Sequence, residues 1–321
     1  MESIRKLRSR IVENVRRVLV GRDKPVELVL IALLAQGHVL IEDVPGVGKT
    51  TLVRALAKSV GCEFRRIQFT PDLLPSDVTG VSVYDQRTGS FQFRPGPIMA
   101  NIVLADEINR TSPKTQASLL ECMQERQVTV DGITYPLPEP FMVLATQNPV
   151  EYEGTFPLPE AQLDRFMLQV SLGYPNLVEE AEMLTRFSAA DPLEELQPVA
   201  TAQDILEAQQ AVRRVRANRA VREYVARVVH STRHHPQVHL GASPRATLAL
   251  FRACQALAAS RGRSYIIPDD VKFLAPAVLA HRLLLRPEAR LEEATGHSVI
   301  QSVLNQVPVP VGDVDDTPGG P

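Results

Sequence analysis

A short segment of the chain combines the residue types that bind phosphate. It reads PGVGKTT over residues 45–51. When such a glycine-rich turn leads into a helix, its backbone N–H groups surround an anion and the helix dipole adds favourable charge. Gly46 and Gly48 let the backbone approach a triphosphate closely. The Lys49 ammonium would neutralise the β- and γ-phosphates, and the Thr50 hydroxyl would bind Mg²⁺.

The segment departs from the common pattern G-x-x-x-x-G-K-[ST] at its first position, where Asp43 replaces glycine. That position falls at the end of the preceding strand and contributes little direct contact to phosphate. A chance turn is the alternative explanation for the segment taken alone. The predicted nucleotide-binding residues are Asp43, Val44, Pro45, Gly46, Val47, Gly48, Lys49, Thr50 and Thr51.

Two adjacent acids strengthen the case for a nucleotide. The nearly apolar run ANIVLADE, residues 100–107, closes on Asp106 and Glu107. In open α/β sheets ligands bind at the carboxyl ends of the strands. We expect Asp106 to contact Mg²⁺ through water and Glu107 to polarise the attacking water. A strand that simply ends in two solvated acids is the alternative, and the phosphate-binding segment upstream argues against it.

Three further residues are candidates for the same chemistry. Asn148 ends the apolar run PFMVLATQN and could orient the water from the side opposite Glu107. Arg165 lies in LPEAQLDRF, and Arg245 lies in the first turn of a helix beginning in GASPRA. A guanidinium stabilises charge on transferred phosphoryl oxygens. Each residue also has an ordinary alternative, a turn asparagine or a surface arginine.

The elements that must position these residues form an α/β fold. Short, fully apolar strands are typical of a parallel sheet covered by helices on both faces. We expect strands within HVLIED, EFRRIQF, ANIVLADE and PFMVLATQN, and helices over residues 2–20, in PVELVLIALLAQG ending at Gly37, in TTLVRALAKSVG and in KTQASLLECMQER. Hairpins are predicted at residues 80–97 and 128–137, the second around Asp131-Gly132.

The composition changes to nearly pure helix after about Pro175. We expect a nucleotide-binding α/β domain over residues 1–175, a helical lid domain over 176–308 and a flexible acidic, Pro/Gly-rich tail over 309–321. Thr201 and Asp204 have the spacing of a capping box.

Composition excludes several classes of function. The 321-residue chain has a net charge of −2 and no tryptophan, so neither its net charge nor its composition indicates binding to nucleic acid or to a membrane. No apolar run is long enough to span a bilayer and no signal peptide is evident, and three scattered cysteines fit a reducing cytoplasm. His230, His234, His235 and His239 lack acidic or thiol partners and are expected to be surface residues. The basic run RRVRANRAVREYVAR is expected to be a solvated helix face.

Taken in order, these motifs resemble the MoxR family of AAA+ ATPases, within the helix-2-insert clade of AAA+ proteins. The match runs from EDVPGVGKT through FRPGPIMANIVLADEINRTSPKTQASLLECMQERQVTVDG and LATQNPVEYEGTFPLPEAQLDRF to GASPRA, and covers roughly residues 10–300. Asp43 is itself typical of that family's loop. The resemblance implies a P-loop NTPase (AAA+) sheet followed by the helical lid.

The resemblance also implies roles. The P-loop residues become Walker A, Asp106 and Glu107 become Walker B, Asn148 becomes sensor 1 and Arg245 becomes sensor 2. Arg165 becomes an arginine finger acting on a neighbouring subunit's ATP, which implies a ring, usually a homohexamer. Gln68 could contact Glu107 and gate it.

Family members are similar to chaperones that mature or insert cofactors into client proteins. They commonly work with a von Willebrand factor A domain partner.

Three functional classes follow. An ATP-driven protein remodeller is favoured by the whole series of motifs. A nucleic-acid-directed motor, helicase- or initiator-like, shares the core and the hairpins but is expected to carry basic hairpin tips, and VTVDGITYPL is neutral to acidic. A scaffold with negligible turnover would lack the catalytic acid or the finger, and both Glu107 and Arg165 are present.

Overall fold

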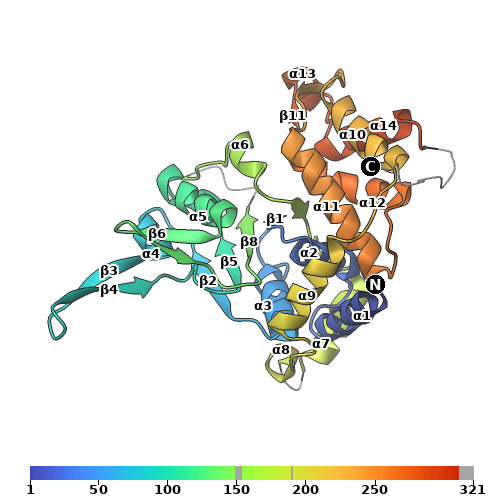
Figure 1. Cartoon of the computed structure of the whole chain (residues 1–321). Helices are drawn as coiled ribbons and strands as arrows, with labels where there is room; N and C mark the ends of the chain where they lie inside the picture. The colour runs from blue at the N-terminus through green and yellow to red at the C-terminus, as the bar shows by residue number, and fades with distance from the viewer. Residues whose placement is uncertain (149–153, 189–190, 311–321) are drawn as a thin grey trace, which may run out of the picture.

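A five-stranded parallel sheet forms the centre of the computed structural model, which describes residues 1–148, 154–188 and 191–310. The strand order is β2-β5-β8-β1-β9 (Figure 1). The strands are β1 (Val39–Glu42), β2 (Phe64–Gln68), β5 (Ile102–Asp106), β8 (Met142–Gln147) and β9 (Leu168–Val170). Since all pairs are parallel, the carboxyl ends of β1, β5 and β8 meet at one edge.

Apolar side chains leave the sheet alternately toward two cores. Ile102 and Leu104 pack into one hydrophobic cluster, and Val103 and Ala105 pack into another. Both faces of β5 are therefore buried, which is why its sequence shows no polar alternation. The helices of the first part are α1 (Glu2–Arg16), α2 (Asp23–Leu34), α3 (Lys49–Ser59), α4 (Pro75–Thr79), η1 (Ile108–Arg110), α5 (Pro113–Glu125) and α6 (Glu160–Leu163).

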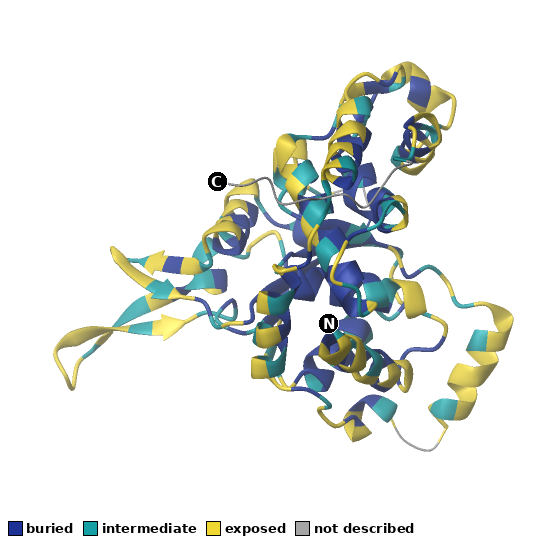
Figure 2. Ribbon diagram, turned by 45° about the vertical axis from the view of Figure 1, so that its right-hand side comes forward, coloured by how far each residue is buried: buried dark blue, intermediate teal, exposed yellow. Residues whose placement is uncertain are grey.

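Both predicted hairpins are present. They are formed by β3 (Gly80–Asp85) with β4 (Ser90–Pro95), and by β6 (Gln127–Val130) with β7 (Ile133–Pro136). Asp131 and Gly132 have φ of 51° and 79°, the left-handed conformation that a tight hairpin turn requires. The β3–β4 hairpin projects far from the body (Figure 1), and most of it is exposed (Figure 2). The rings of Phe93 and Tyr135 stack with centroids 4.1 Å apart and so join the two hairpins.

The part after residue 175 is helical, as predicted, and adds a small two-stranded pair. Its elements are α7 (Leu177–Arg186), α8 (Pro192–Glu195), α9 (Ala202–Val212), α10 (Arg219–Thr232), β10 (Val238–Leu240), α11 (Pro244–Ser260), α12 (Pro268–Leu279), η2 (Ala280–Arg282), β11 (Leu284–Leu285), α13 (Pro287–Leu291) and α14 (Gly296–Gln306). Thr201 caps α9 in a capping box with Asp204. One hydrophobic cluster joins α1–α3 to α9–α12.

The structure corrects two local expectations. The helix α2 stops at Leu34, and Gln36 rather than Gly37 takes the left-handed conformation, with φ of 59°. His235 is buried and lies 3.3 Å from the Ser302 hydroxyl, whereas His230, His234 and His239 are exposed as expected. Most of the predicted tail, residues 311–321, lies outside the described residues. No helix in the described ranges is long and apolar enough to cross a membrane.

Candidate functional site

The phosphate-binding segment lies between β1 and α3, in the strand–loop–helix setting that its chemistry needs. Gly46 and Gly48 have φ of 85° and 93°, which side chains rarely adopt. Lys49 begins α3, and the N-cap residue is Gly48, which has no side chain to cap the helix. The N-terminus of α3 therefore meets the loop directly, the setting in which a helix end binds an anion. The Lys49 ammonium donates to the Asp43 carbonyl at 2.7 Å.

Asp43 has a structural reason for replacing glycine. Its Oδ2 accepts from the backbone N–H groups of Leu172 (2.6 Å) and Gly173 (2.8 Å) and from the Ser171 hydroxyl (3.1 Å). Its Oδ1 accepts from Val44 N at 3.0 Å. The side chain thus fastens the start of the loop to the segment that follows β9. Sequence reasoning missed this contact because its partners lie about 130 residues away.

A cavity of about 300 Å³ opens beside the loop. Gly48 and Thr51 line it on one side and the apolar side chains of Leu19, Met183 and Phe187 line it on another. The cavity therefore offers polar backbone at one end and an apolar wall at the other, which suits a nucleotide's phosphates and base.

The helix α7, which carries the apolar wall formed by Met183 and Phe187, is held to the body mainly by polar contacts. Arg22 donates to the Gly173 carbonyl at 3.0 Å and lies 3.5 Å from the Glu179 carboxylate.

The two acids lie at the carboxyl end of β5 and are held differently. Asp106 is buried, and its Oδ2 accepts from Arg66 Nη2 at 2.6 Å. Glu107 follows in a left-handed conformation, φ 58°, and its Oε2 accepts from Gln68 Nε2 at 2.7 Å. The expected contact between Gln68 and Glu107 is therefore present. Arg110 Nε lies 3.3 Å from the same carboxylate.

Thr146 connects the two acids to the neighbouring strand. Its hydroxyl donates to Asp106 Oδ1 at 2.5 Å and accepts from Glu107 N at 2.8 Å. Asn148 follows two residues later, directly after β8, and is 6% exposed. Thr146, Arg66 and Arg110 were missed from sequence. A polar residue inside the apolar run MVLATQN was the available signal for Thr146.

The donor set suits Mg²⁺ bound together with phosphate. Asp106 and Thr50 supply carboxylate and hydroxyl oxygens, the donors that Mg²⁺ prefers. Arg66 and Thr146 occupy the two oxygens of Asp106, so a magnesium ion would contact this carboxylate through water or after Arg66 moves. In the part of the chain that the structure describes, no three His, Cys, Asp or Glu side chains form a metal site of their own. A magnesium ion here would therefore depend on phosphate oxygens for further ligands.

The segment of Arg165 contacts the start of the helix that carries Arg245. Arg165 donates to the Leu120 carbonyl of α5 at 2.8 Å. The preceding Asp164 accepts from the hydroxyl of Ser243, the N-cap of the helix α11 whose first turn contains Arg245. Asp164 also pairs with the buried Arg282 at 2.8 Å.

Sheet direction separates this arginine pair from the loop. Met167 N, two residues after Arg165, donates to the carbonyl of His38, which precedes β1. Arg165 therefore lies near the amino end of β1, and the phosphate-binding loop follows the carboxyl end of the same strand. Neither Arg165 nor Arg245 is among the described residues that line the cavity beside the loop.

The thiols show no sign of chemistry. Burial raises the pKa of the Cys62 thiol to about 11 and that of the Cys122 thiol to about 12. Burial likewise raises the pKa of Cys254. All three are free and protonated at neutral pH.

Comparisons with known proteins agree with this geometry. The sequence model of the ATPase family associated with various cellular activities (AAA) matches residues 38–168, and that of the AAA lid domain matches residues 230–303. The chain is 40% identical to a putative ATPase from Cytophaga hutchinsonii of solved structure, with a TM-score of 0.89 and coverage of 97% of this chain and 98% of the other.

Several relatives share nearly the full length. The chain is 55% identical to the uncharacterized protein YeaC of Bacillus subtilis, covering 97% of both chains. It is 45% identical to Chaperone MoxR1 of Mycobacterium tuberculosis, over 94% of this chain and 82% of the relative. It is 32% identical to Protein MoxR of Methylorubrum extorquens, over 94% and 95%. The chain belongs to the MoxR family of AAA+ ATPases.

Proposed function

We propose that the protein is a Mg²⁺-dependent ATP hydrolase. The observation that carries this proposal is the arrangement of Asp106, Glu107 and Asn148 at the same sheet edge as the P-loop, with Thr146 holding both acids. The bound ion would supply charge neutralisation of the phosphates, with Thr50 and Asp106 as its protein ligands.

The chain's own residues then have distinct tasks. The backbone from Asp43 to Thr51 binds the phosphates, and Lys49 neutralises them. Glu107 polarises the attacking water and Asn148 orients it from the other side. The contact of Glu107 with Gln68 keeps the carboxylate away from that water until Gln68 releases it.

We further propose that the site is completed by a second copy of the chain. Arg165 lies near the amino end of β1, away from its own P-loop, which supports its action on a neighbouring subunit's ATP, and Arg245 is the proposed sensor 2. Such a heterologous contact repeats around a closed ring, and a hexamer is the expected size. The proposed parts of each subunit are the nucleotide-binding domain (1–175), the lid (176–308) and the tail (309–321).

Mixing two inactive variants tests this arrangement. Glu107→Gln keeps the arginines and loses the acid, whereas Arg165→Ala keeps the acid and loses the finger. Each alone should bind ATP and hydrolyse it at least about a hundredfold more slowly. In a 1:1 mixture about one interface in four pairs an intact acid with an intact arginine, so turnover should return to a substantial fraction of wild type.

Two controls make the mixing result decisive. Arg214→Ala removes an exposed arginine outside both sites and should hydrolyse ATP normally. Light scattering of the Glu107→Gln protein should show a shift to about six subunits with ATP and Mg²⁺. A mixture with no recovered turnover would contradict the finger in trans. Normal turnover of Glu107→Gln would contradict the assigned acid.

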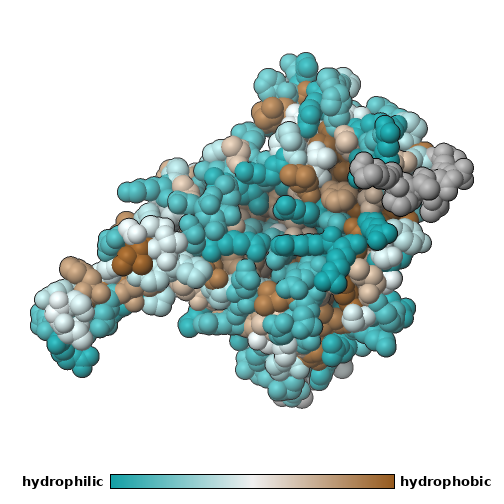
Figure 3. Space-filling view, in the orientation of Figure 1, coloured by the Kyte–Doolittle hydropathy of each residue, from teal (hydrophilic) through white to brown (hydrophobic). Residues whose placement is uncertain are grey.

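The hairpins favour a polypeptide client over nucleic acid. Phe91 is 71% exposed and Tyr84 is 52% exposed on the projecting hairpin, and Ile133 is exposed on the other. Apolar patches mark the same region in the space-filling view (Figure 3). Exposed apolar side chains bind other proteins, and the relative named Chaperone MoxR1 points the same way.

We therefore propose that ATP hydrolysis drives chaperone-like remodelling or cofactor-insertion maturation of client proteins, with a von Willebrand factor A domain protein as partner. A nucleic-acid-directed motor is the competing function. Phe91→Ser should weaken stimulation of the ATPase by an unfolded protein and leave the basal rate unchanged. Stimulation by an oligonucleotide that the substitution does not affect would favour the competing function.

A further inference from the structure

Three arginines from distant parts of the chain line one cavity on the side away from the P-loop. Arg126 follows α5, Arg213 follows α9 and Arg252 lies on α11. The cavity measures about 380 Å³, and glutamines are the other polar residues that line it. In the space-filling view, hydrophilic side chains cover the middle of this face, where α2, α9 and α11 come together (Figure 3).

Polar contacts hold two of the arginines in place without neutralising them. Arg126 Nη2 donates to the Gln36 carbonyl at 3.0 Å, and Arg213 donates to the Gln36 side-chain oxygen. Gln36 Nε2 in turn donates to Gln209 Oε1 at 3.0 Å. Within the described ranges, Arg252 makes neither a hydrogen bond nor an ion pair. The acceptors in the cavity are therefore neutral, and the three positive charges remain.

The three guanidiniums repel one another. None of them forms an ion pair with a described carboxylate. Burial lowers the pKa of Arg126, and the charges of Arg213 and Arg252 lower it further against the opposing effect of the exposed Glu139. Arg213 and Arg252 are exposed, so solvent screens part of this repulsion, and an anion bound in the cavity would relieve the rest.

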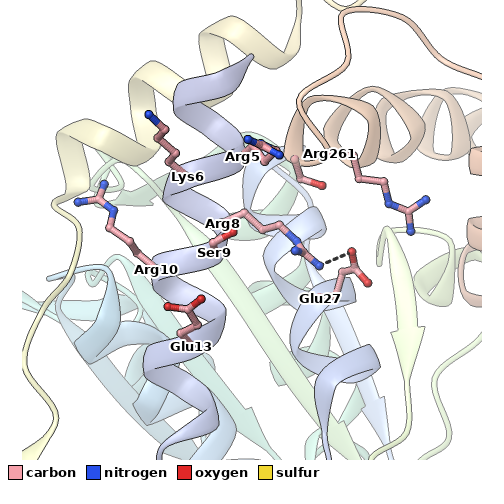
Figure 4. A pocket seen from close by; sticks show the side chains of 9 residues that line it. Arg5, Lys6, Arg8, Ser9, Arg10, Glu13, Glu27 and Arg261 are labelled. Atoms are coloured by element: carbon pink, nitrogen blue, oxygen red, sulfur yellow. Dashed lines mark hydrogen bonds and ion pairs between the residues drawn. The ribbon is translucent and has the colours of Figure 1, made fainter.

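A larger basic cavity beside α1 differs in this respect. It measures about 850 Å³ and is lined by Arg5, Arg8 and Arg261 among others. Arg8 points at Glu27 and pairs with it at 2.9 Å (Figure 4), and Arg5 pairs with Glu2 at 2.6 Å. Arg5, Arg8 and Arg261 are ion-paired, and Glu13 and Glu27 line the same cavity, whereas no carboxylate is among the described residues that line the three-arginine cavity.

We propose that the cavity formed by Arg126, Arg213 and Arg252 binds a small, multiply charged phosphate compound. Arginine forks match phosphate oxygens and retain their charge at every physiological pH. A volume of about 380 Å³ accommodates a diphosphate or triphosphate group. The bound anion joins Gln36 and Arg126 of the nucleotide-binding part to α9 and α11 of the helical part, and so stabilises their contact.

Tripolyphosphate titration by calorimetry tests the proposal. The wild-type protein is first saturated with ADP and equimolar Mg²⁺, so that the P-loop is filled. One tripolyphosphate should then bind per chain. Arg252→Gln should weaken this binding at least about tenfold, because it removes one charge-assisted contact. Arg214→Gln, which removes the same charge next to Arg213 but outside the cavity, should change the affinity less than about twofold.

Thermal unfolding without anion provides a second readout. Arg252→Gln should leave Tm unchanged or raise it, because the substitution relieves repulsion, and at a given concentration tripolyphosphate should raise Tm of the wild type more than Tm of the variant. A lowered Tm with undiminished binding would overturn the proposal. So would tighter binding of a tricarboxylate than of tripolyphosphate, or tighter binding of a single-stranded oligonucleotide whose affinity rises with its length.

Discussion

Replacing Asp43 by glycine restores the common P-loop pattern and should nevertheless destabilise the protein. The carboxylate is 7% exposed and accepts four hydrogen bonds, three of them from Leu172 N, Gly173 N and Ser171 Oγ. A glycine at this position leaves all four donors without their acceptor. Glycine at position 43 would match the common P-loop pattern, whereas aspartate at this position stabilises the folded chain.

The expected loss in the free energy of unfolding depends on which of the four donors water can reach in the Asp43→Gly protein. Leu172 is buried, so its N–H would remain unsatisfied at a cost of about 1–3 kcal/mol. Gly173, Ser171 and Val44 are partly exposed, and water replaces much of their loss. The added glycine costs roughly a further 0.5–1 kcal/mol through the entropy of the unfolded chain. The expected loss in the free energy of unfolding is about 2–4 kcal/mol.

Urea unfolding followed by circular dichroism measures this loss, since the chain has no tryptophan to report fluorescence. Ser171→Ala removes one of the four bonds and should cost less than about 0.5 kcal/mol, because water replaces this exposed bond. ADP affinity of Asp43→Gly should fall by less than about tenfold, because the Asp43 contact to Lys49 uses the backbone carbonyl. A loss below about 1 kcal/mol would refute the role assigned to this side chain.

Three other predictions concern the framework around the site. His38 is buried, with Nε2 3.0 Å from the Met123 carbonyl and Nδ1 accepting from Val143 N. The folded state therefore favours the neutral ring, and burial lowers the pKa of His38 to about 4. The neutral His38 contributes fully to the free energy of unfolding above pH 6.5. As pH falls from 6.5 toward 4, this contribution of about 3 kcal/mol is lost. In urea unfolding at a series of pH values, His38→Gln should reduce the dependence of stability on pH in this range. Asp164→Ala leaves Arg282 buried without its carboxylate and should cost about 3–5 kcal/mol in urea unfolding; a cost under 1 kcal/mol would contradict the pairing. A double-mutant cycle of Phe93→Ala and Tyr135→Ala should give a coupling energy of about 0.5–1.5 kcal/mol, and additive effects would mean that the stacked rings do not hold the hairpins together.

Local signals in the sequence were enough for most of the framework. The apolar runs predicted β1, β5 and β8, because a strand buried on both faces has no polar alternation. The edge strand β2 was predicted within EFRRIQF, although most of its side chains are polar and exposed. Asp131-Gly132 predicted a hairpin, because both residues tolerate positive φ. The short strand β9 and the pair β10–β11 were not predicted. Each has only two or three residues, too few for periodicity to appear.

Site residues that lie in one continuous segment were predictable from the sequence, whereas contacts between residues of different segments were not. The P-loop and the acids at Asp106 and Glu107 are each contiguous, so their chemistry is visible in the sequence. Thr146 and Arg66 act through Asp106 from 40 residues away on either side. Whether a polar residue on one strand lies beside an acid on the next depends on the pairing register of the two strands, and the sequence alone does not specify that register.

The position of Arg165 illustrates how a contact within one chain bears on assembly. Asp164 binds Arg282 and Ser243, and so fixes the start of α11 against the loop after α6. This contact holds the segment of Arg165 against the start of the helix that carries Arg245, near the amino end of β1. A flexible pair would lose side-chain and backbone entropy each time two subunits met. If Arg165 acts on a neighbouring subunit as proposed, this contact within the folded chain would reduce the entropy that assembly costs.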